Sequence, residues 1–347
     1  MEHIAIDVGG RKSYVVVRSE KGEVMLSKAV ETEALAAFLK KRARSRVLLE
    51  TCAESFAIAD EALALGHDVR VIPSDKVRIL GVGHHGKKTD RRDAEALSQA
   101  SVMTDLKGVH IPSAQARELK AKLAARDALV SCRVLLVNTC RGILRCSRIT
   151  VKASTPKSFA KKAREAFVAR GLATPAELER ALVCIVAVEE QIQSATFELD
   201  ELSKGHKVCR ILRTAPGVGP VVSVAFVATM DGVERFSGAH ALESYLGLVP
   251  GEDSSSMSVR RTGITKAGSD RMRRLLVQAA WQAVLRHPRD PMVEWAKEVM
   301  LRRGKGIGIV ALARKMAGIL YGMWRDGTDY DPSRGAAVLS KEAPPSN

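Results

Sequence analysis

Ile4-Ala5-Ile6-Asp7-Val8-Gly9-Gly10 is the stretch that decides the fold of the first third of the chain. A short apolar run that ends at two glycines is typical of a buried strand followed by a tight turn. Further patterns alternate behind it, with strands at 14–18, 23–29, 46–50 and 69–72 and helices at 33–44 and 54–65. Three strands in series, then helix, strand, helix and strand, predict a mixed sheet with helices on its faces.

Two long helical patterns follow in the middle of the chain. Apolar residues recur every seven positions from Ala116 to Leu144 and again from Leu178 to Leu199. A sevenfold apolar repeat on long helices predicts a coiled-coil or helical-hairpin seam. Whether this stripe only packs the hairpin or also joins two subunits stays open at this stage.

The chain of 347 residues is long enough for two or three domains, each with its own core. From about residue 206 it is richer in Gly, Ser and Arg and ends in helical patterns at 269–286 and 291–324. We therefore predict an α/β domain at 1–110, a long helical spacer at 111–205, a mainly helical C-terminal domain at 206–328 and a disordered tail at 329–347.

The chain is strongly basic, with 55 Lys and Arg against 39 Asp and Glu and a net charge of +16. Lys and Arg neutralise phosphates and release condensed counterions, so this excess favours nucleic acid as the partner. The charge is also clustered, which argues against a protein that is merely basic. We expect nucleic-acid contacts from Lys87, Lys88, Arg260, Arg261, Lys266, Arg271, Arg273 and Arg274.

The sequence predicts no membrane segment, no signal peptide and no zinc site. The longest apolar run, 221–228, is far shorter than the ~20 residues of a membrane helix. The six cysteines are scattered without a Cys-x-x-Cys pair. We expect a cytoplasmic protein with reduced thiols.

Four acidic residues are spaced as a metal site would need them. Asp7 and Glu50 end two predicted strands, and Asp90 and Asp93 lie one turn apart at the start of a predicted helix. Each alone has an ordinary explanation, namely a turn, an ion pair with an arginine, or a helix cap. Together, four converging carboxylates would repel one another without a divalent cation, and hard oxygen ligands favour Mg²⁺ or Mn²⁺. We favour a metal-dependent nuclease site, since two such ions ~4 Å apart are the usual machinery for phosphodiester cleavage.

The turn Pro216-Gly217-Val218-Gly219 precedes an apolar helix pattern at 221–230. Glycines at a helix entrance leave backbone N–H groups free to approach a phosphate. The turn therefore predicts a helix-hairpin-helix element in which Gly217 and Gly219 contact nucleic-acid backbone, the alternative being an ordinary tight turn.

A serine-rich loop, 254–256, lies among many arginines. A flexible linker is one explanation. A serine nucleophile that attacks a phosphodiester is the other, because arginines would neutralise the charge that develops on the phosphate oxygens. Residue chemistry alone leaves both open.

The order of the acids Asp7, Glu50, Asp90 and Asp93, together with Lys-Thr-Asp-Arg-Arg-Asp-Ala-Glu-Ala-Leu at 88–97, resembles a known pattern. It is similar to the amino-terminal RuvC/RNase H-like domain of the DEDD insertion-sequence transposases, the insertion-sequence 110/1111 type of bridge-RNA-guided recombinases. The order Gly247-Leu248-x-Pro250, serine pair, Gly263-Ile264-x-Lys266-x-Gly268, then Arg-Arg-Leu-Leu at 273–276 resembles the carboxy-terminal domain of the same family.

This resemblance implies a transposase that cuts and rejoins DNA through a covalent serine–DNA intermediate. The nucleophile would be Ser255, with Ser254 as the alternative, and the four acids would hold Mg²⁺. The chain departs from the family pattern where Ser256 replaces a Gly and Ser269 replaces an Asn. The resemblance also implies a non-coding guide RNA and a homodimer that assembles to a tetramer.

Three other functions are compatible with parts of the sequence. A RuvC-like nuclease or junction resolvase would use the acids without a serine step. A kinase of the actin and sugar-kinase type would use the Asp-Val-Gly-Gly turn as a phosphate loop, but it needs a second sheet in the carboxy-terminal half, where helical patterns prevail. A catalytically dead RNA-binding protein would not need four intact acids.

Overall fold

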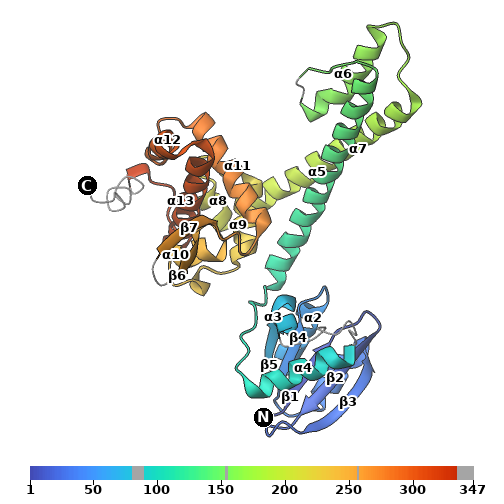
Figure 1. Ribbon diagram of the computed structural model, residues 1–347, viewed down its shortest axis with the longest axis vertical. Helices are drawn as coiled ribbons and strands as arrows, with labels where there is room; N and C mark the ends of the chain where they lie inside the picture. The colour runs from blue at the N-terminus through green and yellow to red at the C-terminus, as the bar shows by residue number, and fades with distance from the viewer. Residues whose placement is uncertain (80–89, 153–154, 256–257, 334–347) are drawn as a thin grey trace. The chain divides into compact units, whose positions relative to one another are not determined.

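The computed structural model describes residues 1–79, 90–152, 155–255 and 258–333, although the side chains of 75, 78–79, 90, 156–157 and 252–262 are outside that description. The chain divides into two compact units, Met1–Pro112 and Ser113–Asn347 (Figure 1). Each unit is built around its own hydrophobic core.

The first unit is a mixed sheet in the strand order β3-β2-β1-β4-β5. The central strand β1 pairs antiparallel with β2 and parallel with β4, and β4 pairs parallel with β5. The prediction of a mixed sheet is therefore confirmed. The elements of this unit are β1 (His3–Asp7), β2 (Lys12–Arg18), β3 (Val24–Glu31), η1 (Thr32–Ala34), α1 (Leu35–Lys40), β4 (Arg46–Glu50), α2 (Ser55–Ala64), β5 (Asp68–Ile72), α3 (Ser74–Ile79) and α4 (Asp90–Met103).

Different helices cover the two faces of this sheet. Alternate residues along a strand point to opposite faces. Ile4 and Ile6 of β1 therefore pack with α1 and α2, whereas Ala5 between them packs with Val77 of α3 and Leu97 of α4. Figure 1 shows α4 lying across the sheet in front of β1 and β2. The strand pattern in the sequence thus buries apolar residues on both faces.

The second unit begins with two long helices that pack as an antiparallel hairpin. Its elements are α5 (Ala114–Cys146), α6 (Pro156–Val168), α7 (Ala176–Gly205), α8 (Lys207–Leu212), α9 (Pro220–Met230), η2 (Val233–Arg235), α10 (Ala239–Tyr245), β6 (Pro250–Ser255), β7 (Ser258–Ile264), α11 (Asp270–Arg286), α12 (Pro291–Arg303) and α13 (Lys305–Asp326). Arg126 Nε donates to Thr196 Oγ1 at 2.8 Å, and Arg133 Nη1 donates to Glu189 Oε2 at 2.7 Å. These bonds define one antiparallel register between α5 and α7.

That register explains the sevenfold apolar repeat. Extended along the hairpin, it places Leu123 opposite Leu199 and Leu144 opposite Leu178, and all four side chains are buried. Leu144 and Leu178 share a core with Phe159 of α6 at one end of the hairpin. Leu123 and Leu199 share the core of the helices that follow α7. The base of the hairpin is thus part of the carboxy-terminal core, so packing continues across the predicted boundary at 205/206.

Helices α9 and α13 form the centre of this core. Val224, Phe226 and Ala228 of α9 are almost fully buried, as are Leu312 and Leu320 of α13. By length and composition α13 passes as a membrane span, with a mean hydropathy of 1.3, but it is a core helix with 56% of its apolar window buried.

Two segments differ from the sequence-based expectation. The serine-rich segment is not a loop, because β6 and β7 pair as an antiparallel hairpin that carries it. The tail from residue 329 begins in contact with the core, since the Tyr330 hydroxyl donates to the Asp290 carboxylate at 2.9 Å and its N–H donates to Thr214 Oγ1 at 2.8 Å. The rest of the tail, 334–347, lies outside the described residues.

Candidate nuclease and transposase sites

Asp7 and Glu50 end neighbouring parallel strands. Ile6 of β1 lies opposite Leu49 of β4, so the next residue of each strand, Asp7 or Glu50, stands at the same carboxyl edge of the sheet. Because alternate residues of a strand point to the same face, Asp7 lies on the face of Ala5 and Glu50 on the face of Leu48. Helix α4 covers this face. Two of the four predicted acids therefore share one edge and one face.

The third acid reaches this edge through α4. His3 Nδ1 and Ser101 Oγ share a hydrogen bond of 2.6 Å, so the end of α4 lies at the start of β1. Asp93 precedes Ser101 by about 12 Å of helix. β1 runs from His3 to Asp7 over about 13 Å, that is, from the end of α4 back toward its start. Asp93 is therefore level with Asp7.

Two further contacts support this placement of α4. Arg18, which pairs with His3 across β1 and β2, donates from Nε to Ser98 Oγ at 2.8 Å. Along its length α4 packs against both β1 and β2, and at its start Arg91 donates from Nε to Glu95 Oε1 at 2.8 Å, a bond that raises the pKa of Arg91. α4 thus runs antiparallel to β1, with its start at the carboxyl edge.

Asp93 lies on the buried side of α4, with only 3% of its surface exposed. Its neighbours Ala94 and Leu97 face the sheet as well. Asp90 opens the same helix one turn earlier, but its side chain lies outside the description, as do Lys87 and Lys88. Among the described residues no group of three His, Cys, Asp or Glu side chains is close enough to hold a metal ion. That the carboxylates of these acids come close enough to bind one metal ion stays a prediction.

The predicted nucleophile lies at the end of a strand. Ser255 is the last residue of β6 and pairs with Ser258 of β7, and Ser254 pairs with Val259. Both serines are thus at the tip of the β6–β7 hairpin. The side chains of these serines and of Arg260 and Arg261 lie outside the description, so the choice between Ser255 and Ser254 stays a prediction.

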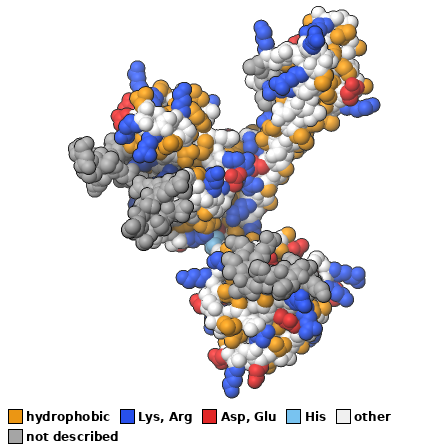
Figure 2. Space-filling view, in the orientation of Figure 1, with side chains coloured by type: hydrophobic (Ala, Val, Ile, Leu, Met, Phe, Trp, Pro, Cys, Tyr) orange, Lys and Arg blue, Asp and Glu red, His pale blue; other side chains and the backbone are white. Residues whose placement is uncertain are grey.

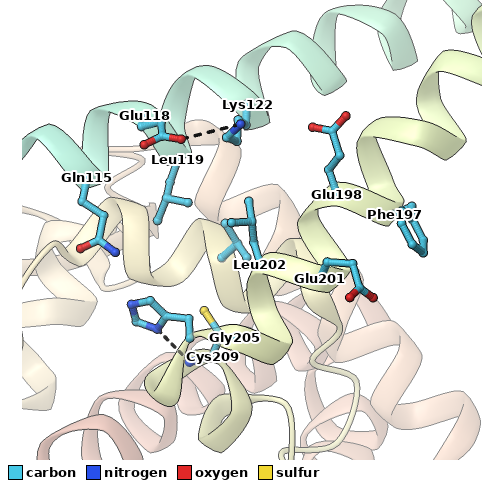
Figure 3. Close-up of a pocket in the computed structure, with 12 residues that line it drawn as sticks. Gln115, Glu118, Leu119, Lys122, Phe197, Glu198, Glu201, Leu202, Gly205 and Cys209 are labelled. Carbon is cyan, nitrogen blue, oxygen red and sulfur yellow. Dashed lines mark hydrogen bonds and ion pairs between the residues drawn. The ribbon is translucent and has the colours of Figure 1, made fainter.

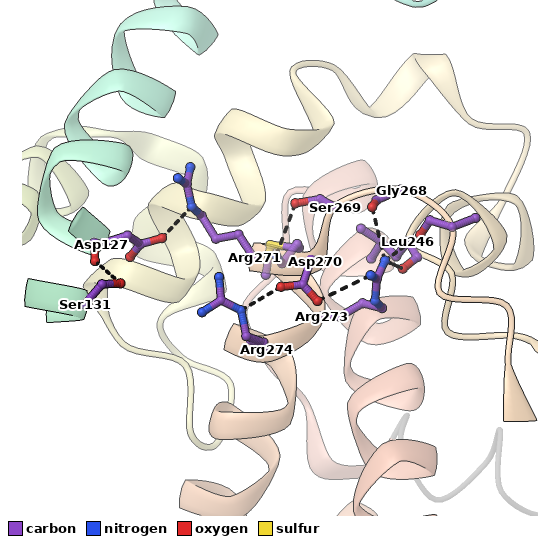
Figure 4. Close-up of polar contacts among 11 residues, drawn as sticks. Asp127, Ser131, Leu246, Gly268, Ser269, Asp270, Arg271, Arg273 and Arg274 are labelled. Carbon is purple, nitrogen blue, oxygen red and sulfur yellow. Dashed lines mark hydrogen bonds and ion pairs between the residues drawn. The ribbon is translucent and has the colours of Figure 1, made fainter. Parts of the chain in front are cut away.

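The arginines at the start of α11 make intramolecular bonds, shown in Figure 4. Arg271 Nε donates to Asp127 Oδ2 of α5 at 2.6 Å, and Arg274 Nε donates to Asp270 Oδ2 at 2.9 Å. Arg273 donates to backbone carbonyls before β6 and after β7. Lys266 is exposed and has a positive φ of 57°. No sequence pattern pointed to Asp127, which is 144 residues from its partner.

The two glycines of the predicted helix-hairpin-helix turn have different surroundings. Gly217 has a φ of 78°, and a Cβ there would collide with the Ala279 carbonyl oxygen and lie 2.9 Å from the Ala283 nitrogen of α11. Gly219 caps α9 and has no atom near its Cβ position. Packing against α11 therefore accounts for Gly217, whereas the space beside Gly219 leaves room for a phosphate.

A cavity of about 720 Å³ opens where α5, α7, α8 and α9 meet (Figure 3). Its wall carries Glu118, Glu198 and Glu201, so its charge is opposite to that of a phosphate site. Cys209 lies on its wall, and burial raises the pKa of this thiol to about 11. The sequence did not single out these residues, because they come from helices far apart along the chain.

The Lys and Arg side chains of each unit are spread over its visible face rather than gathered in one patch (Figure 2). Several also serve as internal partners, such as Arg133 with Glu189 and Arg164 with Glu179. The net charge of +16 comes mostly from residues 113–347, which carry 37 Lys and Arg against 23 Asp and Glu.

Comparison with known proteins gives two family matches, one beginning in each unit. A model described as the transposase IS116/IS110/IS902 family matches residues 209–294, and a model of DEDD transposases of the IS110 type, described as transposase, matches residues 4–147.

The chain belongs to the IS116/IS110/IS902 family of transposases.

Curated relatives agree with this family. The transposase for insertion sequence element IS1111A of Coxiella burnetii is 29% identical over 68% of this chain and 66% of its own length. The transposase for insertion sequence element IS1328 of Yersinia enterocolitica is 27% identical over 94% of this chain and 98% of its own. A probable family 20 transposase of Pseudomonas aeruginosa is 29% identical over 82% of this chain and 86% of its own. The chain is therefore a DNA transposase, and its mixed sheet is consistent with the RNase H-like DEDD fold.

Proposed function

We propose that this transposase moves an insertion sequence by cutting and rejoining DNA through a covalent serine–DNA intermediate. The proposal is supported chiefly by Asp7 and Glu50, which end neighbouring parallel strands, and by Asp93, which is buried on the helix that covers that face of the sheet. Acids from two strand ends and one helix start are what a metal-dependent nuclease requires. The matched carboxy-terminal region contains the serine hairpin.

The donor set of this edge fits a hard divalent cation. Asp7, Glu50 and Asp93 supply carboxylate oxygens, and Asp90, one turn before Asp93, would add a fourth. Burial removes water from the Asp93 carboxylate and so strengthens its attraction for a cation. When bound there, Mg²⁺ (or Mn²⁺) would stabilise negative charge on phosphate oxygens. The sheet and α4 would hold the acids at the edge before any substrate arrives.

Ser255 supplies the nucleophile. Its Oγ forms a bond to the phosphorus while the bond from phosphorus to one deoxyribose oxygen breaks. The hydroxyl proton leaves Oγ, and the departing DNA oxygen takes up a proton. The phosphodiester is thus conserved as a serine ester, and attack by a hydroxyl of another DNA end releases Ser255 and rejoins the strand.

A non-coding RNA that pairs with donor and target DNA would choose the sites, while the protein binds the nucleic-acid backbone through its charge and shape.

Strand exchange between two duplexes needs several active sites at once, so a dimer that assembles to a tetramer is expected. The exposed apolar residues Leu135 and Val183 of α5 and α7 support a subunit contact, such as a coiled-coil seam, along the hairpin. The protein would work in the cytoplasm, with reduced thiols.

The test compares the full-length wild type with Ser255→Ala and Ser254→Ala, each with element DNA and the RNA encoded beside the element. Denaturing gels should show a protein–DNA adduct for the wild type and Ser254→Ala and none for Ser255→Ala. An adduct lost only in Ser254→Ala would move the nucleophile to Ser254. An adduct that persists in both variants would overturn the serine mechanism.

A RuvC-like nuclease or junction resolvase is the second candidate. It is favoured by one observation, that the acids of the sheet edge lie in a compact unit ending at Pro112 without the serine hairpin. Such an enzyme would release free DNA ends and never form a serine adduct. The same gels therefore distinguish the two functions.

A further inference from the structure

The β6–β7 hairpin is joined to the rest of its unit through a narrow neck, which we define as residues 246–249 and 265–268. Two backbone bonds cross it: Thr265 N–H donates to the Val249 carbonyl at 3.0 Å, and Lys266 N–H donates to the Gly247 carbonyl at 3.1 Å. The two sides of the neck are therefore in direct contact just below the strands.

Two glycines allow this close approach. Gly247 has a φ of 67° and Gly268 a φ of 72°, a region that favours glycine. A Cβ at Gly247 would collide with the backbone of Ala267, and one at Gly268 would collide with the carbonyl oxygen of Tyr245. The neck is thus packed backbone against backbone, and small displacements on one side are transmitted to the other.

Arg273 of α11 binds both sides of this neck (Figure 4). Its Nη1 lies 3.2 Å from the Leu246 carbonyl oxygen on one side and 2.6 Å and 3.2 Å from the carbonyl oxygens of Ala267 and Gly268 on the other. Only 11% of the Arg273 side chain is exposed. Its helix is fixed in the core by the buried side chains of Met272 and Leu276.

The neighbouring Arg274 offers a natural contrast. Its side chain is 65% exposed, and it forms an ion pair with Asp270 on the same helix, a carboxylate that Arg273 also approaches at 3.5 Å. An exposed ion pair of this kind contributes little to stability. Arg273 and Arg274 therefore carry the same charge on the same helix, but Arg273 alone of the two is bonded to the neck.

We infer that Arg273 is a positioning residue for the strand-transfer step. It ties both sides of the neck to α11 and so fixes the direction in which the hairpin presents Ser255 to a phosphate. The inference rests on the proposed function of Ser255. Arg273 is then not a direct phosphate ligand, because its Nη1 already contacts three carbonyl oxygens inside the protein.

Arginine suits this role better than lysine. The neck is contacted by Nη1, which the planar guanidinium holds in a fixed geometry, whereas an ammonium is a compact charge on a flexible stem. Lysine at 273 would therefore contact the same carbonyls without holding both sides in one arrangement. A displacement of a reacting group by about 1 Å can lower a reaction rate by about 100-fold.

The experiment uses the full-length protein with its DNA and RNA and compares Arg273→Ala, Arg273→Lys and the matched control Arg274→Ala. Adduct formation is followed in single turnovers over a range of DNA concentrations, and the melting temperature of each protein is measured. Arg273→Ala should form adduct at least about 10-fold more slowly at saturating DNA, with an unchanged half-saturating concentration. Arg273→Lys should fall between. Arg274→Ala should keep the wild-type rate at saturating DNA, because loss of its predicted DNA contact would raise only the half-saturating DNA concentration. Added guanidinium ion at millimolar concentration should restore part of the Arg273→Ala rate but none of the Ser255→Ala rate.

Two results would overturn the inference. One is a saturating rate in Arg273→Ala equal to that of Arg274→Ala. The other is a slower rate accompanied by an equally large rise in the half-saturating DNA concentration, which would make Arg273 a DNA contact.

Failure of the proposed function would look different, because the wild type itself would form no adduct. Hydrogen exchange at the Thr265 and Lys266 amides then decides whether Arg273 holds the neck. Faster exchange in Arg273→Ala than in Arg274→Ala supports that role, and equal exchange removes it.

Discussion

Burial has different consequences for Cys209 and Asp93. Cys209 is surrounded by apolar residues of the carboxy-terminal core, and loss of hydration raises its pKa to about 11, so the thiol stays protonated at neutral pH. Asp93 is buried on the helix that covers one face of the sheet, and the proposed function gives its carboxylate a cation as partner. One buried group is thus inert, and the other is a candidate ligand.

Cys209 should therefore resist alkylation in the folded protein. With iodoacetamide at pH 8, we expect the exposed thiols of Cys132, Cys146 and Cys184 to react first, and Cys209 to react only after denaturation. Peptide mass spectrometry over time measures each rate. A Cys209 rate equal to that of the exposed thiols would contradict the buried placement.

The sequence placed Asp7 and Glu50 at strand ends, as in the structure, because a strand that ends in an acid is a local pattern. It could not show where α4, which carries Asp93, lies on the sheet. That placement depends on the bond between His3 and Ser101, which are 98 residues apart. Likewise, the sequence grouped Arg273 with the other basic residues, because its bonds to the neck depend on the folded position of α11.

The two glycines of the turn between α8 and α9 have different structural surroundings. Gly217 meets α11 at backbone distance, whereas Gly219 stands at the open start of α9. The sequence pattern Gly-Val-Gly suggested one function for both glycines. The structure gives Gly217 a packing role that the pattern could not reveal.

Alanine at these two positions should separate stability from binding. Gly217→Ala should destabilise the protein by about 2 kcal/mol or more, because of its positive φ and its collision with α11. Gly219→Ala should cost about 1 kcal/mol or less while weakening DNA binding if this turn holds a phosphate. Thermal melts and DNA-binding titrations measure both effects. Equal melting temperatures for the two variants would contradict the packing of Gly217.

Helix α4 is held on the sheet partly by a histidine that titrates. Burial, with help from Arg46 and the amino terminus, lowers the pKa of His3 below its ordinary value of 6.5. The unfolded chain therefore takes up a proton at a higher pH than the folded chain does. Stability from this group is fully present above about pH 6.5 and is lost as the pH falls through the folded pKa.

The variant His3→Gln should lessen this pH dependence. Its amide can still hydrogen-bond Ser101, but it does not titrate, so the melting temperature should fall less between pH 7 and pH 5 than in the wild type. Thermal melts of the full-length proteins at pH 7, 6 and 5 give the comparison. Parallel curves for the two proteins would show that His3 does not contribute.

The serine hairpin was the element that the sequence missed. Its strands are rich in Ser, Gly and charged residues and lack the apolar alternation of a half-buried strand. The strands pair with each other and not with a larger sheet, so their register comes from the neck and not from an apolar face.

Across the whole molecule, charge is the property most clearly linked to function. Most of the excess of 16 positive charges lies in the second unit, because residues 113–347 carry 37 Lys and Arg against 23 Asp and Glu, whereas residues 1–112 carry 18 against 16. This excess suits contact with nucleic-acid backbone. Base pairing with a guide RNA would then supply the sequence specificity that such contacts lack.

Affinity for DNA should consequently depend steeply on salt. If six or more phosphates are neutralised, binding of the full-length protein to a duplex should weaken by about 1,000-fold between 50 and 200 mM salt. Fluorescence anisotropy with a labelled duplex measures this. A change of less than about 10-fold would contradict broad electrostatic binding.

The order of elements in both units was largely predictable from the sequence, and the sevenfold repeat marked the facing residues of α5 and α7 correctly. The sequence did not predict correctly where the hairpin ends and the carboxy-terminal core begins. Leu123 and Leu199 belong to the repeat and to that core at once, so no break in composition marks where one packing ends and the other begins.

The account depends most on a divalent cation held by acids that the fold brings to one sheet edge. Binding of Mn²⁺ to the full-length protein, measured by electron paramagnetic resonance, tests this most directly. The account predicts that Glu50→Gln weakens Mn²⁺ binding at least about 10-fold, whereas Glu54→Gln, which changes an exposed acid four residues further along the chain, leaves it unchanged. Equal Mn²⁺ affinity in the wild type and Glu50→Gln would contradict the proposed site.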